Sequence, residues 1–362
     1  MPLDSMMEQH PKCELHVHLE GTVTISDHIE RSKRHQHCAQ GSSSSSISPG
    51  GNESETVHDD HVDETAILEQ RLRNVVDLVT FLDVFEMFVA GFEEAEDFAD
   101  AVHKYARRVE GSGVVYAEVS FDPQAHLSRG VPLGTMLAGL AEGQVRVRED
   151  VGVSVAFIAC FHREKDGMAA LSILEDIAAH PLGGSAAGLV VGIGLDNVEP
   201  EGFPAKFIPL FARAKALGYG LTAHCDVDQP HSHAHIRACV EELGVTRIDH
   251  GMDVITSPPL VSLCQSRGVA LNMCPTLMFR DIHGRQEFRV GRVRAALAQG
   301  LRVTVNSDDP GLMRGLFLGD VWSLVSPDPA EAVALARNSI EASFLPETEK
   351  QGLRERLNAF RV

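Results

Sequence analysis

Residues 188–197 read GLVVGIGLDN, an apolar run that ends abruptly in an aspartate and an asparagine. Such a run is typical of a strand that is buried on both faces, as in a parallel sheet covered by helices. Seven further segments have the same β-branched or nearly continuous apolar character: 14–18, 114–121, 153–159, 220–224, 247–250, 269–273 and 302–306. The sequence therefore predicts eight buried strands.

Helix-like stretches separate these strands. Residues 203–218, FPAKFIPLFARAKALG, end in a glycine after basic residues, which is typical of a helix C-terminus. Alternation of strand and helix repeated eight times predicts a (β/α)8 TIM barrel, in which active sites form at the carboxyl ends of the strands. A doubly wound sheet is the alternative, but no glycine-rich GxGxxG turn follows the first strand.

One segment interrupts this alternation. Residues 36–63 contain five consecutive serines, a Pro-Gly-Gly sequence and an acidic stretch, and this composition cannot form a packed core. We therefore expect a single barrel domain over residues 1–362, with a mobile Ser-rich insertion at about 36–63. The chain after about residue 320 reads as helices that cover the barrel.

The composition limits the partners of this 362-residue chain. Lys and Arg number 32 against 51 Asp and Glu, a net charge of −19. This charge repels phosphate backbones and anionic lipid, so a small-molecule substrate is favoured and neither nucleic acid nor membrane binding is expected. The seven cysteines form no CxxC pair, the N-terminal segment MPLDSMMEQHPK has no apolar core of signal-peptide length, and no run approaches the length of a membrane span. A cytoplasmic protein is predicted, whereas its oligomeric state is not.

Histidines and a carboxylate end several of the predicted strands. His16 and His18 lie at alternate positions of the first strand and therefore face the same side. His224 ends the fifth strand, and Asp308 follows the eighth. Three imidazoles and one carboxylate suit Zn²⁺ and leave one position for water, so the sequence predicts a zinc site at the barrel rim. Taken alone, each residue also has a structural explanation, such as a cap of the following turn by Asp308.

Six motifs that occur in order along the chain resemble a known family. They are KCELHVHLEGT (12–22), YAEVSFDPQAHLSRGV (116–131), GIGLDNVEP (192–200), RIDHGMD (247–253), NMCP (272–275) and VTVNSDDPG (303–311). These motifs resemble the adenosine/adenine deaminase family of the metal-dependent amidohydrolase superfamily. Apart from the Ser-rich insertion they span nearly the whole chain. The resemblance implies a (β/α)8 barrel with one zinc ion.

The resemblance also implies the roles of individual residues in catalysis. His16, His18, His224 and Asp308 would hold one zinc ion per chain, and His250 would orient the attacking water. Zinc lowers the pKa of bound water toward about 7, and Asp308 would accept the proton that this water releases.

Three further residues are implied in substrate binding. Asp309 would bind the purine nitrogen N7, and Asn197 lies where the family contacts the ring. Glu20 stands where adenosine-specific members have an aspartate that contacts ribose, and this longer acid could fill the ribose space. Glu20 and the motif FDPQAHLSRGV (121–131) together favour adenine over adenosine as the substrate.

The sequence departs from the family pattern after the fifth strand. The family has a glutamate three residues after the strand histidine, where it protonates the purine at N3, but this chain has Val227 there. A valine cannot transfer a proton, and general acids contribute about 10²–10⁴-fold to rates. Asp226 or Asp228 could replace the glutamate as the catalytic acid.

Three functional hypotheses remain. The first is zinc-dependent hydrolytic deamination of adenine to hypoxanthine and ammonia, with Asp226 or Asp228 as the acid. The second is deamination of adenosine, an N6-substituted purine or a related heterocycle in an altered pocket. The third is a non-catalytic binding protein that retains zinc, although the complete set of ligands argues against it.

Overall fold

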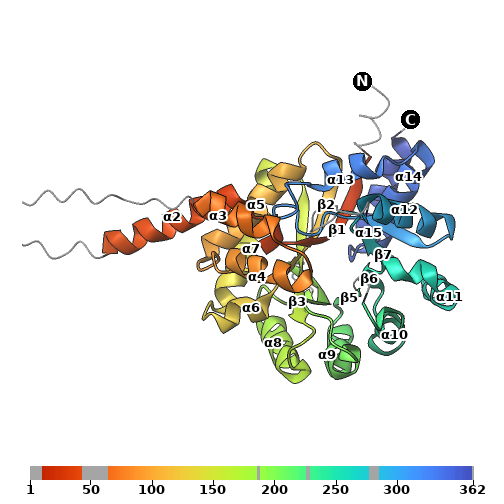
Figure 1. Cartoon of the computed structure of the whole chain (residues 1–362), viewed down its shortest axis with the longest axis horizontal. Coiled ribbons are helices and arrows are strands. Elements are labelled where there is room, and N and C mark those ends of the chain that lie inside the picture. The colour runs from red at the N-terminus through yellow and green to blue at the C-terminus, as the bar shows by residue number, and fades with distance from the viewer. Residues whose placement is uncertain (1–9, 43–63, 186–187, 226–228, 277–284, 361–362) are drawn as a thin grey trace, which may run out of the picture.

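A computed structural model describes residues 10–42, 64–185, 188–225, 229–276 and 285–360. Eight parallel strands lie in the order β1 to β8, so that neighbours in the sheet are also neighbours in the chain (Figure 1). They are β1 (Lys12–His18), β2 (Val114–Phe121), β3 (Ser154–His162), β4 (Val190–Asp196), β5 (Gly220–Cys225), β6 (Arg247–His250), β7 (Ala270–Met273) and β8 (Arg302–Val305). The predicted (β/α)8 TIM barrel is confirmed.

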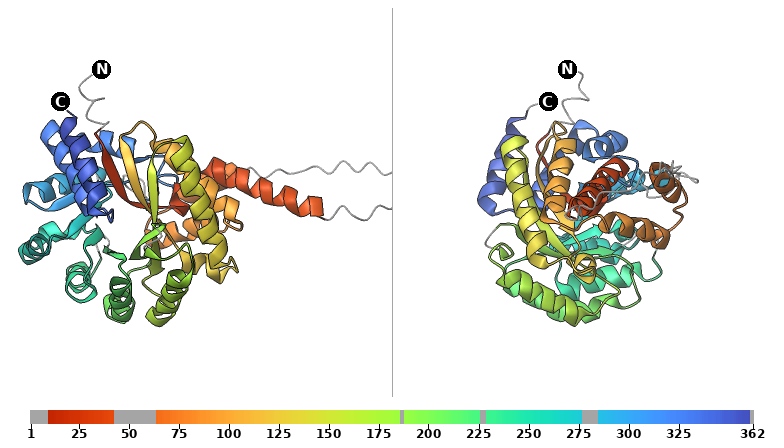
Figure 2. Two further views of the ribbon diagram at one scale, coloured as in Figure 1. Left: turned by 180° about the vertical axis from the view of Figure 1, so that it is seen from behind. Right: turned by 90° about the vertical axis from the view of Figure 1, so that its left-hand side faces the viewer.

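Helices surround this sheet (Figure 2). The described α-helices are α2 (Ile25–Ser42), α3 (Glu64–Arg73), α4 (Leu78–Val89), α5 (Ala95–Val109), α6 (Pro123–Ser128), α7 (Leu133–Asp150), α8 (Gly167–Ala179), α9 (Ile208–Ala216), α10 (Ser232–Ala238), α11 (Pro258–Arg267), α12 (Arg285–Ala298), α13 (Leu318–Val325), α14 (Pro329–Ala342) and α15 (Glu347–Ala359). Shorter helical turns are η1 (Glu20–Thr22), η3 (Phe203–Phe207), η4 (Cys239–Leu243) and η5 (Met252–Thr256).

The strands are buried on both faces, as their apolar sequences predict. Every residue of β1 is buried, because one face of the strand points into the barrel and the other packs against helices that include α14. The strand boundaries agree with the predicted ones to within three residues. The largest difference at a carboxyl end is in β3, which continues to His162 and pairs there with Asp196 of β4. This extension brings His162 to the barrel mouth.

The barrel closes between β8 and β1 with little backbone pairing. In the described residues, one isolated bridge joins the two edges, between Val17 and Asp308. Side chains complete this β1–β8 seam: the N–H of Leu15 donates to Asn306 Oδ1 at 2.8 Å. Residues of the first strand and of the segment that follows the last strand therefore meet at the carboxyl end of this seam.

The insertion and the tail differ in how much of each is described. Residues 36–42 continue α2, which contains no proline and extends away from the barrel beside α3 (Figure 1). The rest of the insertion, residues 43–63, lies outside the described residues. The tail consists of the later part of α13 followed by α14 and α15. Among the described helices, none has the length and apolar character that crossing a membrane requires.

Candidate metal and active site

The carboxyl ends of β1 and β5 and the turn after β8 bring four buried side chains to one point at the barrel mouth. Ligand atoms of His16, His18, His224 and Asp308 all lie within 4.8 Å of one another. Nε2 of His16 is 3.0 Å from Oδ1 of Asp308, and Nε2 of His18 is 3.1 Å from Nε2 of His224. The structure thus brings together the four residues that the sequence predicts as metal ligands.

The ring nitrogens of His224 indicate that a cation fits between these side chains. Its Nδ1 donates a hydrogen bond to the carbonyl oxygen of Leu195 at 2.8 Å. Burial and the neighbouring histidines hold the pKa of His224 well below its usual value, so the ring is neutral and Nε2 presents a lone pair toward His18. Nitrogen ligands in a tetrahedral zinc site are about 3.3 Å apart, close to the separation of these two Nε2 atoms.

Carboxylates face the outer ring nitrogens of the other two histidines. Nδ1 of His16 lies 3.6 Å from Oδ1 of Asp249, and Nδ1 of His18 lies 3.8 Å from Oδ2 of Asp196. Asp249 is itself held by the hydroxyl of Thr222 at 2.7 Å. Carboxyl groups that accept a hydrogen bond from the outer nitrogen orient metal-binding imidazoles. Here both distances exceed hydrogen-bond length, and burial and the charge of Asp122 raise the pKa of Asp196 well above its usual value.

His16 and Asp308 form an ion pair when no cation lies between them. Burial lowers the pKa of His16, but the carboxylates of Asp308 and Asp249 outweigh this effect and raise it to about 9. Burial raises the pKa of Asp308, but His16 and His250 outweigh this effect and hold it well below its usual range. A metal ion that binds here must displace the proton on His16, so metal binding depends on pH.

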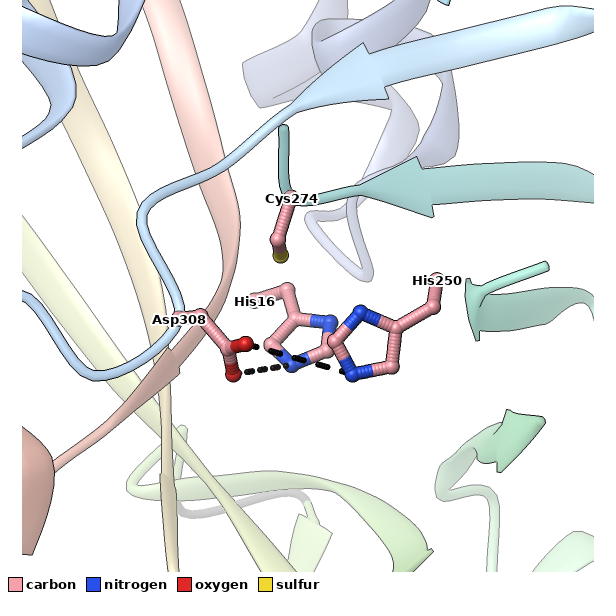
Figure 3. Close-up of side chains that lie close together, drawn as sticks. All are labelled: His16, His250, Cys274 and Asp308. Carbon is pink, nitrogen blue, oxygen red and sulfur yellow. Dashed lines mark hydrogen bonds and ion pairs between the residues drawn. The ribbon is translucent and has the colours of Figure 1, made fainter. Parts of the chain in front are cut away.

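A second group of possible ligands overlaps the first. Figure 3 shows Cys274 and His250 beside His16 and Asp308, and Nε2 of His250 lies 4.0 Å from Oδ2 of Asp308. The Cys274 thiol donates to the carbonyl oxygen of Asn272 at 3.9 Å. Burial and the nearby Asp308 raise the pKa of Cys274 well above its usual value. The set with His18 and His224, whose Nε2 atoms lie 3.1 Å apart, has the ligand spacing of a zinc site, and His250 lies beside it.

Three residues of this site have strained backbones. Asn197, His250 and Asp308 have φ angles of 66°, 63° and 67°, in the left-handed region that side chains other than glycine rarely occupy. Each lies at or just after the end of a strand. Such strain persists only where the surrounding structure fixes the conformation, and it is frequent at functional sites.

A pocket lies over the four candidate ligands. Its lining combines apolar residues of α4 with polar residues from the strand ends: His18, Leu78, Phe81, Leu82, Phe85, Asp122, Arg163, Asp196, Asn197, His224, His250, Asp308 and Asp309. Ligand pockets commonly combine an apolar wall with a few placed polar groups. This pocket therefore presents an apolar wall and a polar wall to a ligand.

Asp309 lies in the polar wall, with Oδ1 buried and without a hydrogen-bond partner. Burial and the charge of Asp308 raise the pKa of Asp309 well above its usual value, which favours the neutral carboxyl group, and that form can donate a hydrogen bond. Gly21 packs against it, since a Cβ atom at residue 21 would lie 1.9 Å from Oδ1 of Asp309. A glycine is therefore required there if Asp309 keeps this position.

Glu20 and Asn197 occupy different positions relative to the pocket. Asn197 lines it, and its side-chain nitrogen lies 3.2 Å from Nδ1 of His162. Glu20 is fully buried and is not among the described residues that line the pocket. Its Oε1 accepts hydrogen bonds from Nε2 of His126 at 2.7 Å and from the N–H of Asp122 at 3.3 Å.

Sequence analysis did not select Asp122 and His162, which the structure places at the mouth. Nε2 of His162 lies 3.5 Å from Oδ2 of Asp122. Burial lowers the pKa of His162, but Asp122 and Glu164 outweigh this effect and raise it to about 10. Asp122 directly follows a predicted strand and could have been found by the rule that found the others. His162 lies beyond the predicted end of its strand at residue 159.

Arg163 was also missed, and it joins the ends of two strands. Its guanidinium donates to the carbonyl oxygen of Asp196 at 3.1 Å, to that of His224 at 2.9 Å and to Oε2 of Glu199 at 3.0 Å. The side chain is buried, so these bonds fix the backbone where β4 and β5 end.

The two candidate proton donors cannot be placed relative to this pocket. Asp226 and Asp228, together with Val227, lie outside the described residues. The described chain before them ends at Cys225, the last residue of β5, which is buried. Their role as the catalytic acid stays a prediction.

The chain is similar to known deaminases over nearly its whole length. The Adenosine deaminase family model matches residues 31–360. An uncharacterized deaminase of Schizosaccharomyces pombe is 33% identical over 362 residues, covering 99% of this chain and 98% of that protein. The adenine deaminase of Cupriavidus metallidurans is 33% identical over 344 residues, covering 94% and 88%. The crystal structure of an adenine deaminase from Arthrobacter aurescens superimposes with a TM-score of 0.79 at 29% identity, covering 97% and 98%.

The barrel and its histidine–aspartate site define an enzyme of the amidohydrolase type. More narrowly, the chain belongs to the adenosine deaminase family, and it is a hydrolytic deaminase. The resemblance found in the six sequence motifs is confirmed.

Proposed function

We propose that the protein is a zinc-dependent adenine deaminase, which converts adenine and water to hypoxanthine and ammonia. The observation that carries this proposal is the convergence of His16, His18, His224 and Asp308 beneath the pocket. The identity of 33% with the adenine deaminase of Cupriavidus metallidurans, over nearly the whole chain, supports adenine as the substrate.

In this proposal His16, His18, His224 and Asp308 hold one zinc ion per chain. When bound, zinc supplies a water molecule whose pKa is lowered toward about 7, and hence a nucleophile at neutral pH. With the ion bound, Asp308 would accept the proton of that water at its carboxylate. His250, whose Nε2 lies 4.0 Å from Oδ2 of Asp308, would orient the same water.

The pocket walls bind and orient the purine ring. Asp309, with its neutral carboxyl group, donates a hydrogen bond to N7, which can only accept one. Asn197 contacts the ring from the end of β4. Phe81 and Phe85 of α4 pack against the ring from the apolar side, as aromatic pairs do in offset or edge contacts. Asp226 or Asp228 donates a proton to N3 in place of the glutamate of the family.

The charge of the pocket favours a free base over a nucleotide. Among the described lining residues Arg163 is the sole lysine or arginine, and its guanidinium binds Glu199 and backbone carbonyls. A phosphate would instead meet the carboxyl groups of Asp122 and Asp196. Glu20 is bonded to His126 and is not among the described lining residues, so the hypothesis that it fills the space for ribose rests on the family resemblance.

An N6-substituted purine is a second candidate substrate, because an apolar side chain lies close to the reaction centre. The ring of Phe85 makes an edge contact with the ring of His18, with 6.5 Å between the centroids. A small alkyl group on the amine would meet this apolar surface instead of a polar one.

The test combines elemental analysis of the purified protein with chromatographic measurement of the purine product, hypoxanthine from adenine or N6-methyladenine and inosine from adenosine. Ammonia is the second product from adenine and adenosine, and methylamine is the second product from N6-methyladenine. We expect about one zinc per chain and the highest kcat/KM for adenine. Faster turnover of adenosine would reject the adenine assignment. A zinc-containing protein that converts none of the three would support the non-catalytic hypothesis.

A further inference from the structure

We infer that Glu14 and Tyr105 are positioning residues that hold Asp308 in its metal-binding place from outside the pocket. The inference rests on the proposed function, since it takes Asp308 as a metal ligand. Neither residue is among the described residues that line the pocket, so both act through the turn that carries Asp308.

Three hydrogen-bond donors converge on the buried carboxylate of Glu14. The hydroxyl of Tyr105 donates to Oε2 at 2.6 Å. The N–H and the hydroxyl of Ser307 donate to Oε1 at 3.0 Å and 2.5 Å. Glu14 and Tyr105 have no exposed surface, and a buried carboxylate is tolerated only when donors of this kind satisfy it. The cluster of Glu14, Tyr105 and Ser307 is therefore a built polar site within the apolar core.

The neighbouring Asp308 needs such support because its backbone is strained and lies beyond the strand. β8 ends at Val305, and Asp308 has a φ of 67°. Two further bonds hold it: its N–H donates to the carbonyl oxygen of His16 at 3.2 Å, and its own carbonyl oxygen accepts from the N–H of His18 at 3.0 Å. Both bonds come from β1 and fix only the backbone of Asp308.

Glu14 adds the contact that fixes Ser307, the residue before Asp308. It lies on β1 two positions before His16, and the pairing of β1 with β2 shifts register between Glu14 and Val17. By binding both polar groups of Ser307, it sets the direction in which the chain enters Asp308. Tyr105 belongs to α5, so its hydroxyl links an outer helix to the β1–β8 seam, where His16 and Asp308 meet.

The test measures how fast the zinc-loaded full-length protein releases its metal to a chelator in excess. Tyr105→Phe removes one hydroxyl and keeps the buried ring. We expect about a 10–100-fold faster release, the range typical of lost contacts that orient metal ligands. In the cobalt-substituted protein, the visible absorption bands of Tyr105→Phe should also shift, because the position of the carboxylate ligand changes.

Tyr219→Phe is the matched control. Tyr219 is also buried and its hydroxyl donates to the carbonyl oxygen of Gly183 at 2.8 Å, but it precedes β5, at the end of the barrel opposite the site. We expect metal release within about twofold of the wild type, whatever the change in thermal stability. Equal release by Tyr105→Phe and Tyr219→Phe would overturn the inference, since it would reduce Tyr105 to a structural hydroxyl.

Ser307→Ala gives a second, independent measurement if Tyr105→Phe fails to fold. It removes the hydroxyl donor and leaves the N–H of Ser307 bonded to Glu14. Faster metal release supports the inference, and unchanged release overturns it. A wild-type protein that binds no zinc at all is a separate outcome, which removes the proposed function and this inference together.

Discussion

The two sides of the barrel mouth differ in how closely they follow the family. On the side of β1 and β8, the motifs with His16, His18 and Asp308 follow the family pattern, and the structure brings these side chains together. On the side of β5, His224 joins them, but Val227 stands where the family has its acid. Under the proposed function we therefore expect that the residues for activating water are retained, whereas the residue that protonates the ring has changed.

The largest effect is expected on the retained side. Asp308→Ala removes both a metal ligand and the proposed proton acceptor. It should therefore abolish zinc binding and lower kcat at least about 10⁴-fold, the upper range for a general base. Elemental analysis and ammonia release measure both. Asp166→Ala is a control, because this exposed carboxylate only caps α8. Retained zinc in Asp308→Ala would contradict the ligand assignment.

The next largest effect is expected on the changed side. Asp228→Asn should lower kcat about 10²–10⁴-fold and leave the zinc content unchanged, if Asp228 is the acid that replaces the family glutamate. Asp226→Asn is the paired variant, and one of the two should be nearly silent. Full activity in both would show that the acid lies elsewhere at the mouth.

The pH dependence of zinc affinity tests the ligand role of His16 on the β1–β8 side without an activity measurement. The pKa of His16 is about 9 in the metal-free site, so a proton must leave at neutral pH before zinc can bind. Affinity should therefore rise about tenfold per pH unit, or about 100-fold from pH 6 to pH 8. Competition with a chelator of known affinity at each pH measures this slope. A flat profile would mean that His16 is already neutral without metal.

The smallest effect concerns the polar wall that both sides share. Asp309→Ala should lower kcat/KM for adenine about tenfold, because one hydrogen bond to the ring is lost. Asp309→Asn is the matched variant, since its amide can still donate to N7. Equal losses in the two variants would argue against a donated hydrogen bond.

The fold and the convergence of the four candidate ligands could be predicted from the sequence for the same reason. Buried parallel strands have nearly continuous apolar sequences, and the polar residues that end them meet at one rim. The position of Asp308 could be predicted in this way, but not its support by Glu14, because that contact joins β1 to the turn after β8 through side chains. Likewise His162 was missed because Cys160 and Phe161 extend β3 past the predicted end.

Because β8 and β1 share little backbone pairing, a metal ion bound between them would help to hold the barrel closed. His16 and Asp308 lie 292 positions apart in the chain, and an ion held by both would fasten the first strand to the last. An ion held by both residues would link distant parts of the chain, as a long cross-link does. Its binding free energy would add to the stability of the folded state. Removal of the metal by a chelator should therefore weaken the contact between β8 and β1. The melting temperature and the turnover rate would then fall together.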